Sequence, residues 1–408
     1  MVQDSSMVRE DRLGGTARRR QSEVAPAADK PVEYKYLSAD NHIDLIWYPA
    51  DIIQSRISPK YREHAPKVVE TSKGTMWQWE GDTHAFAADG NDWAKYAARF
   101  LPIEVGEGRL PPSDPEVLIQ HMDLGSFYAG VFYGNTRKWT FKDKDMEKEV
   151  YRVFNDWAAS MCAHDPDRLL VLPWLHAAFP ETCAAEVYRL AEQGVRAVEF
   201  SPNDAGVPVW SPDWEPVWAA ADETGIVLCS HIGDAAGTPY PPNEHGQSLA
   251  HFSQVPFNPM GKQIAEFVFS GMFDRHPSLH LSVAECRIGW LPFLFQWMDR
   301  CHADRIPDTI YQIKERPTHY IRNNMSFTFE EDYVGAKMLR DPEMVIGDCA
   351  IWGGDYPHEQ GQTWPDASDA MERMFGDADP ALMHEVTWAR TQRIFNIKGP
   401  AGGGPSVV

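Results

Sequence analysis

Short apolar runs alternate with segments of helical periodicity along most of this chain. The runs are rich in β-branched and aromatic residues, and the segments between them repeat apolar positions every three or four residues. Eight strand candidates result, at residues 34–39, 128–133, 169–175, 197–200, 226–230, 279–284, 325–329 and 350–352. Helical patterns cover residues 115–124, about 145–163, 180–193, 214–224 and 261–273. Strands that alternate with helices pair in parallel, so the pattern predicts an α/β fold, a (β/α)₈ TIM barrel.

A doubly wound open sheet is the alternative architecture. It lacks support, because no G-x-G-x-x-G motif follows the first strand candidate and polar strand ends occur throughout the series. Closing the sheet into a barrel would bring those polar ends together.

The chain ends and one long connection depart from the repeating pattern. Residues 1–31 and 399–408 offer little apolar surface to bury and are predicted to be disordered tails around a barrel domain at 32–398. About residues 44–125 form a connection too long for an ordinary loop, which predicts a cap over the barrel mouth. Its aromatic residues are Trp47, Tyr48, Trp77, Trp79, Phe86, Trp93, Tyr96 and Phe100.

Composition narrows the possible partners and the compartment. The chain has 408 residues, 43% of them apolar, with 38 Lys and Arg against 59 Asp and Glu, a net charge of −21 that disfavours nucleic acid and anionic membranes. Its longest apolar stretches, 226–232 and 290–295, are far shorter than the roughly 20 residues of a membrane helix. Six cysteines without a CxxC pair and an N-terminus without a signal-peptide apolar stretch predict a cytoplasmic protein with reduced thiols.

The first strand candidate leads into two potential metal ligands. Asp40 and His42 are two residues apart, so on an extended strand both side chains point to one side. At the end of a barrel strand that side can be the interior, where the pair would form half of a metal site. The alternative interpretation is an Asx turn, because Asp and Asn cap turns readily.

Two further candidates follow later strands. His231 comes after the apolar run 226–230, where it is either a metal ligand or a structural histidine that is hydrogen-bonded to a neighbouring strand. Asp355 follows Gly353 and Gly354 and precedes Pro357, which ends the strand. Asp355 is either an inert exposed acid or a partner in the same metal site.

Glu285 and Arg287 follow the strand candidate at 279–284. One interpretation is an ion pair that holds the loop. The other makes Glu285 a water-activating base or a further ligand, and assigns to Arg287 the recognition of a substrate carboxylate. A second tier of residues could line the pocket or simply pack: His176, His251, Trp352, His358 and Asn203.

Several of these motifs together resemble a known family. They are Asp40-x-His42, His231 after the fifth strand, residues 285–293 (ECRIGWLPF) and residues 352–358 (WGGDYPH). Over about residues 34–398 the chain resembles the amidohydrolase superfamily, in the amidohydrolase-related branch that includes aminocarboxymuconate semialdehyde decarboxylase and the resorcylate decarboxylases. The WGGDYPH segment is the most specific of these motifs.

The resemblance implies a (β/α)₈ barrel with one divalent metal held by Asp40, His42, His231 and Asp355. This mixed nitrogen and oxygen set suits Zn²⁺, with Mn²⁺ as a possible substitute. Asp40 stands where many members have histidine, and Glu285 stands where the decarboxylases carry a strand-six histidine. A carbamylated-lysine dinuclear site is not expected, because no lysine follows the fourth strand candidate.

The leading functional hypothesis is a metal-dependent hydrolase. Metal-activated water, deprotonated with help from Glu285 or Asp355, would attack an amide, ester, lactone or activated carbon-carbon bond. The alternative is a non-oxidative decarboxylase (carboxy-lyase), and a third possibility is a catalytically silent binding barrel. The expected partner is a small carboxylated or aromatic substrate, and the expected assembly is a homodimer or a higher homo-oligomer.

Overall fold

The structure, a computed structural model, describes most of the predicted barrel domain. The described residues are 32–87, 111–134, 139–202, 206–231, 253, 258–304, 313–358, 364–401 and 404–405. The predicted tail at 1–31 lies outside them. In the C-terminal segment Gly404 lies against Trp388, where an added Cβ would be 2.6 Å from the indole ring.

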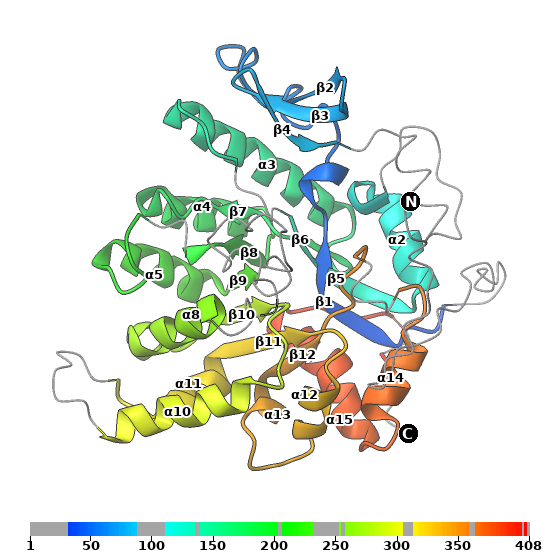
Figure 1. The fold of residues 1–408 in the computed structure, drawn as a ribbon, viewed down its shortest axis with the longest axis vertical. Helices are drawn as coiled ribbons and strands as arrows, with labels where there is room; N and C mark the ends of the chain where they lie inside the picture. The colour runs from blue at the N-terminus through cyan, green and yellow to red at the C-terminus, as the bar shows by residue number, and fades with distance from the viewer. Residues whose placement is uncertain are drawn as a thin grey trace, which may run out of the picture.

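Nine parallel strands run through the described part of the domain (Figure 1). One sheet has the order β1-β5-β6, and the other has the order β12-β11-β10-β9-β8-β7. The strands are β1 (Tyr36–His42), β5 (Phe127–Tyr133), β6 (Leu169–Val171), β7 (Trp174–Leu175), β8 (Ala197–Phe200), β9 (Val227–His231), β10 (Leu281–Ala284), β11 (Met325–Phe329) and β12 (Ala350–Trp352). The predicted strand 169–175 is divided into β6 and β7 around Pro173, which has no N–H for a strand ladder. The α/β prediction and its parallel pairing are confirmed.

The first strand extends further than predicted. Asn41 and His42 continue the parallel register with Phe132 and Tyr133 of β5, so the prediction that the strand ends at residue 39 was wrong. Ladder hydrogen bonds on both sides outweigh the local turn preference of Asp and Asn. Asp40 and His42 therefore belong to the strand itself, and the Asx-turn interpretation does not hold for them.

The ends of β1 and β12 lie side by side. The amide of His42 donates to the carbonyl of Tyr356 at 2.6 Å, and that of Asp355 donates to the carbonyl of Asp40 at 2.8 Å. Gly353 makes this approach possible, because an added Cβ there would lie 2.3 Å from the Cβ of Asp40. The first and last strands of the series thus bring their site residues together.

Helices follow the strands and cover their outer face (Figure 1). The helices are α2 (Pro115–Leu124), α3 (Lys144–His164), α4 (Pro180–Glu192), α5 (Glu215–Thr224), α8 (Asn258–Phe269), α9 (Met272–Arg275), α10 (Leu291–Asp304), α11 (Pro317–Asn324), α12 (Tyr333–Met338), α13 (Ile346–Cys349), α14 (Ser368–Phe375), α15 (Pro380–His384) and α16 (Arg390–Ile394), with a π-helical turn at Glu385–Ala389. The predicted helix 261–273 was wrong in one respect. It divides into α8 and α9 at Gly271, whose left-handed φ of 72° interrupts the helix.

The buried apolar side chains form two hydrophobic clusters, one on each face of the strands. The larger cluster fills the space between strands and helices. The smaller one gathers alternate strand residues from both sheets, among them Leu37, Val131, Leu170, Cys229 and Ile351. Successive side chains of a strand point to opposite faces, so apolar residues in both clusters mean that both faces of the sheets are buried.

The predicted insertion contains a small antiparallel sheet of β2 (Lys67–Thr71), β3 (Gly74–Trp79) and β4 (Asp82–Phe86). Trp77 is fully buried and donates to the carbonyl of Leu45 at 2.9 Å, while Trp79 donates to that of Thr140 at 3.2 Å. The described indoles of the insertion therefore build its core. Trp93, Tyr96 and Phe100 lie outside the described residues. Within the described part of the chain, no helix combines the length and apolarity needed to cross a membrane.

Candidate metal centre

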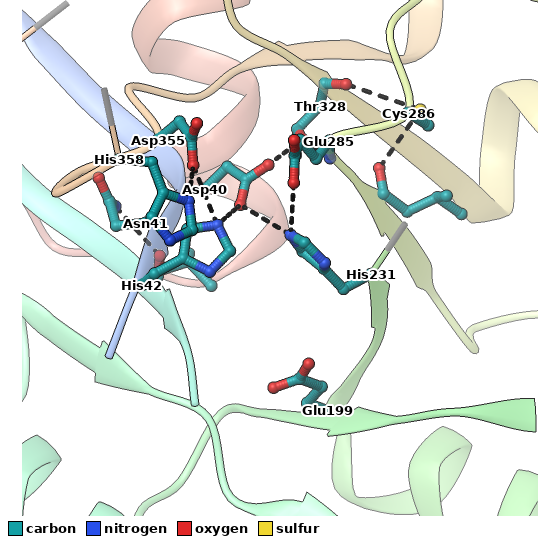
Figure 2. A network of polar contacts seen from close by, with 12 residues as sticks. Asp40, Asn41, His42, Glu199, His231, Glu285, Cys286, Thr328, Asp355 and His358 are labelled. Atoms are coloured by element: carbon teal, nitrogen blue, oxygen red, sulfur yellow. Dashed lines mark hydrogen bonds and ion pairs between the residues drawn. The ribbon is translucent and has the colours of Figure 1, made fainter. Parts of the chain in front are cut away.

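The ends of four strands converge on one cluster of imidazoles and carboxylates (Figure 2). Asp40 and His42 come from β1, His231 ends β9, Glu285 directly follows β10, and Asp355 follows β12 by three residues. The nitrogen and oxygen atoms of Asp40, His42 and His231 that could hold an ion lie within 4.8 Å of one another, as do those of His42, Glu285 and Asp355.

The distances from the Asp40 carboxylate to the neighbouring imidazole nitrogens allow these atoms to bind one metal ion together. Its Oδ1 lies 3.7 Å from His42 Nε2 and 3.9 Å from His231 Nε2. Both distances are too long for hydrogen bonds, yet they are below the roughly 4.2 Å that two metal–ligand bonds can span. Asp40 Oδ1 and His42 Nε2 are buried without a hydrogen-bond partner among the described residues. Such burial is costly unless a cation satisfies the two atoms, so the donor set fits a divalent metal.

Glu285 and Asp355 add carboxylates on two sides of this core. Asp355 Oδ1 lies 3.0 Å from His42 Nε2, and Glu285 Oε2 lies 3.2 Å from His231 Nε2. Both residues have left-handed backbone, with φ of 53° at Glu285 and 54° at Asp355, and Arg287 has φ of 56°. Non-glycine residues rarely adopt this conformation, and its occurrence at three neighbouring site positions is typical of functional sites.

Burial and nearby charges set opposite pKa shifts for the two aspartates. Burial raises the pKa of Asp40 to about 6, although His231 and His42 oppose the shift. Burial also acts to raise the pKa of Asp355, but the imidazoles of His358 and His42 beside it lower that pKa below its ordinary range. A bound cation would favour the charged form of both carboxylates.

His358 supplies a second layer to the cluster. Its Nδ1 lies 2.9 Å from Asp355 Oδ1 and its Nε2 lies 2.8 Å from Asp44 Oδ2. Burial lowers the pKa of His358, but the two carboxylates outweigh it and raise the pKa well above its usual value. His358 is thus a cationic bridge between two acids. Asp44 was missed in the sequence, although it continues the alternation of Asp40 and His42.

The structure pairs Arg287 with a residue that the sequence did not single out. Arg287 Nη1 lies 2.6 Å from Glu330 Oε2 and donates to the carbonyl of Glu331 at 3.2 Å. The interpretation of a Glu285–Arg287 ion pair was therefore wrong, because Glu330 takes that position. Glu330 is fully buried at the end of β11, and burial raises its pKa well above the ordinary value against the effect of Arg287.

Of the residues that the sequence offered as possible pocket-lining residues, the structure places one at the cluster and two elsewhere. His358 joins the cluster, whereas His176 contacts Glu147 of α3 at 2.5 Å and packs on Tyr151. Trp352 is fully buried, and its ring stacks on Phe127 at a centroid distance of 5.6 Å. The structure thus brings neither His176 nor Trp352 into the described cluster. His251 and Asn203 lie outside the described residues.

Comparison with known proteins also points to an enzyme family. The family described as amidohydrolase matches residues 129–395. The chain is 24% identical over 272 residues to the gamma-resorcylate decarboxylase of Rhizobium sp. (strain MTP-10005), a match that covers 63% of this chain and 79% of that protein.

Two solved structures share the fold. An amidohydrolase from Mycobacterium avium subsp. paratuberculosis has a TM-score of 0.66 at 17% identity, covering 90% of this chain and 100% of that one. A dihydroxybenzoic acid decarboxylase from a Polaromonas species, with bound manganese and the inhibitor 2-nitroresorcinol, has a TM-score of 0.58 at 17% identity, covering 90% and 98%. Both support an α/β fold of the TIM-barrel type. The family match spans well over half of the chain, and it confirms that the chain belongs to the amidohydrolase family as an enzyme of the amidohydrolase-related type, hydrolase or carboxy-lyase.

Proposed function

We propose that this enzyme is a metal-dependent carboxy-lyase that removes carbon dioxide from a small aromatic or unsaturated carboxylic acid. The buried, unsatisfied donor atoms of Asp40 and His42 carry the metal part of the proposal. The likeness to gamma-resorcylate decarboxylases, at 24% identity, supports the reaction class.

Asp40, His42, His231 and Asp355 would hold the ion. The donors are two imidazoles and two carboxylates, which suit Zn²⁺ and also Mn²⁺. Manganese has the additional support of the Polaromonas decarboxylase, which contains it. When bound, the ion would act as a Lewis acid that polarises a substrate oxygen.

Glu285 would handle the proton. Its side chain is 14% exposed and its Oε2 faces His231 at 3.2 Å, so the carboxyl group lies at the cluster and can still reach a substrate. In decarboxylation it would deliver a proton to the carbon as the bond to the carboxylate breaks, and that bond's electron pair would remain on the carbon. The proton would be regained from solvent.

Arg287 would recognise a substrate carboxylate. Its side chain is 34% exposed, while Glu330 and the carbonyl of Glu331 hold the guanidinium in one orientation. A planar guanidinium fixed on one edge can present the rest of its fork to a carboxylate.

Hydrolysis is the second candidate, and Glu285 favours it. A carboxylate beside the ion can take a proton from water that attacks an amide, ester or lactone, which is general-base catalysis. The same residues serve both reactions, so the products must distinguish them.

The barrel closure and the cap belong to the proposal as well. Backbone hydrogen bonds between the ends of β1 and β12, and an inner cluster drawn from both sheets, support a closed (β/α)₈ barrel. We propose that the insertion around 44–125 covers its mouth and that residues 1–31 and 399–408 are tails. We also propose that the enzyme is a homodimer or a higher homo-oligomer.

The experiment is product analysis on the metal-loaded enzyme in D₂O and in ¹⁸O-water. We would use 2,6-dihydroxybenzoate as the first probe, followed by a panel of aromatic acids, esters and lactones. Carbon dioxide release with deuterium at the vacated carbon and no ¹⁸O uptake is the expected result. Uptake of ¹⁸O without carbon dioxide would assign hydrolysis instead, and protein that binds neither Zn²⁺ nor Mn²⁺ would exclude both.

A further inference from the structure

Thr328 of β11 lies between two residues of the proposed centre, and nothing in its sequence context marks it. We propose that Thr328 is a positioning residue: its hydroxyl orients Asp40 toward the ion and holds Glu285 beside it. This inference rests on the proposed metal centre and names a residue that acts through its ligands.

The geometry around the hydroxyl is fully specified. Thr328 is completely buried, its Oγ1 lies 2.7 Å from Asp40 Oδ2, and the amide of Glu285 lies 2.6 Å from the same Oγ1. A backbone N–H can only donate, so the hydroxyl oxygen accepts from Glu285 and its single hydrogen points to the carboxylate. The hydrogen bonds therefore run from Glu285 through Thr328 to Asp40, and they connect β10, β11 and β1 (Figure 2).

The first consequence concerns the two oxygens of Asp40. Its Oδ2 is satisfied by Thr328, while its Oδ1 lies 3.7 Å from His42 Nε2 and 3.9 Å from His231 Nε2 without a hydrogen-bond partner among the described residues. The Thr328 hydroxyl thus occupies Oδ2 of Asp40 with a hydrogen bond and leaves Oδ1 available to bind the cation. Asp40 is thereby set up to bind through a single oxygen.

The second consequence concerns the backbone of Glu285. Its φ of 53° is unfavourable for a residue with a Cβ, and its amide is held by Thr328. In this conformation the carboxylate reaches His231. Loss of the hydroxyl would therefore disturb a ligand and the proton-handling carboxylate at once.

Thr328 is itself held rigidly. It is β-branched, which restricts its side-chain torsion, and it lies in a strand that pairs with β10 on one side and with β12 on the other, where it faces Ile351. A hydroxyl on such a support can fix the orientation of its partners. Outer-shell hydrogen bonds of this kind typically contribute 10- to 100-fold to metal affinity.

The test compares Thr328→Val, which removes the hydroxyl and keeps the shape, with Thr328→Ser, which keeps the hydroxyl. Thr391→Val is the matched control, because Thr391 is equally buried and its hydroxyl has no hydrogen-bond partner within the described ranges. Apo proteins would be titrated with Mn²⁺, with free and bound ion followed by electron paramagnetic resonance. We expect the Kd to rise about 10- to 100-fold in Thr328→Val with a changed spectrum of the bound ion, and to stay within a few fold in the other two variants.

Other outcomes overturn the proposal in distinguishable ways. If Thr328→Val binds Mn²⁺ with wild-type affinity and spectrum, the positioning role is wrong while the metal centre stands. If wild-type protein binds neither Mn²⁺ nor Zn²⁺, the proposed function is wrong, and the positioning role of Thr328 is wrong as well because it depends on the metal centre. Should Thr328→Val not fold, Thr328→Ala replaces it; failure of both to fold while Thr328→Ser behaves as wild type would make Thr328 a purely structural residue.

Discussion

The imidazole of His358 stacks on that of His42, with ring centroids 4.1 Å apart and planes inclined by 27°. Both nitrogens of His358 face carboxylates, those of Asp355 and Asp44. Because a carboxylate lies within hydrogen-bond distance of each nitrogen, we infer that His358 acts as the partner of a ligand, Asp355.

Replacing this imidazole should weaken the metal site without abolishing it. His358→Phe keeps a ring for stacking but removes both hydrogen bonds, so we expect the Kd for Mn²⁺ to rise about 10- to 100-fold. Titration of the apo protein with Mn²⁺ measures this Kd. The control is His319→Phe, an exposed position on α11, and unchanged affinity in His358→Phe would contradict the bridging role.

The proposed ligands should behave differently from other histidines and acids. His231→Ala and Asp355→Ala each remove a donor atom from the cluster, so purified protein should lose most of its metal. His384→Ala, at the end of α15, should retain it. Elemental analysis of protein prepared without chelators decides the matter, and full metal content in both cluster variants would refute the ligand set.

Glu285 should be important for turnover rather than for stability. Because Arg287 pairs with Glu330, the change Glu285→Gln breaks no Glu–Arg ion pair. We expect turnover to fall by roughly 10²- to 10⁴-fold while metal stays bound, as is usual when a general acid or base is removed. Glu266→Gln, on the surface of α8, is the control. Activity within a few fold of wild type in Glu285→Gln would assign the proton to another group.

Gly353 should tolerate no side chain. In Gly353→Ala the new Cβ would lie 2.3 Å from that of Asp40, so β1 and β12 must separate. Overpacking of this kind costs about 1–3 kcal/mol, and the displaced Asp40 should also weaken metal binding. Gly206→Ala is the matched control, since an added Cβ there meets nothing within 4 Å. Urea unfolding and metal titration measure the two effects, and a Gly353→Ala variant as stable as Gly206→Ala would contradict the packing argument.

His121 should make the protein sensitive to mild acid. It is fully buried on α2, its Nδ1 lies 2.7 Å from the hydroxyl of Tyr356, and burial lowers its pKa to about 3. In the unfolded chain the His121 imidazole takes up a proton below about pH 6.5, whereas in the folded protein it stays neutral down to about pH 3. The stability that neutral His121 provides is therefore fully present above about pH 6.5 and is lost as the pH falls toward 3.

The loss should amount to about 1.4 kcal/mol for each pH unit below about 6.5. His121→Gln cannot titrate, so the difference in free energy of unfolding between wild type and variant should narrow between pH 7 and about pH 5.5. Urea unfolding at both values measures this difference. An identical difference at the two pH values would show that His121 does not titrate on unfolding.

Much of the strand framework could be predicted from the sequence. Parallel strands between covering helices are buried on both faces, and that burial leaves continuous apolar runs that can be read directly. The same logic located Asp40, His42, His231, Glu285 and Asp355, because a polar residue at the end of a buried run is conspicuous. The end of β1 was misjudged, since the local preference of Asp and Asn for turns lost to hydrogen bonds with strands distant in sequence.

The sequence by itself determined which residue types stand at the strand ends, and only the tertiary structure decided which of them meet. Thr328 looks like any strand threonine, and its role exists only because β11 lies beside β10 and its hydroxyl reaches Asp40. Arg287 has Glu285 two residues away yet pairs with Glu330, and His358 is bound to Asp44 from a segment more than 300 residues distant. Pairing of this kind depends on side-chain direction and on the approach of separate strands to within a few ångströms, and neither is encoded in local periodicity.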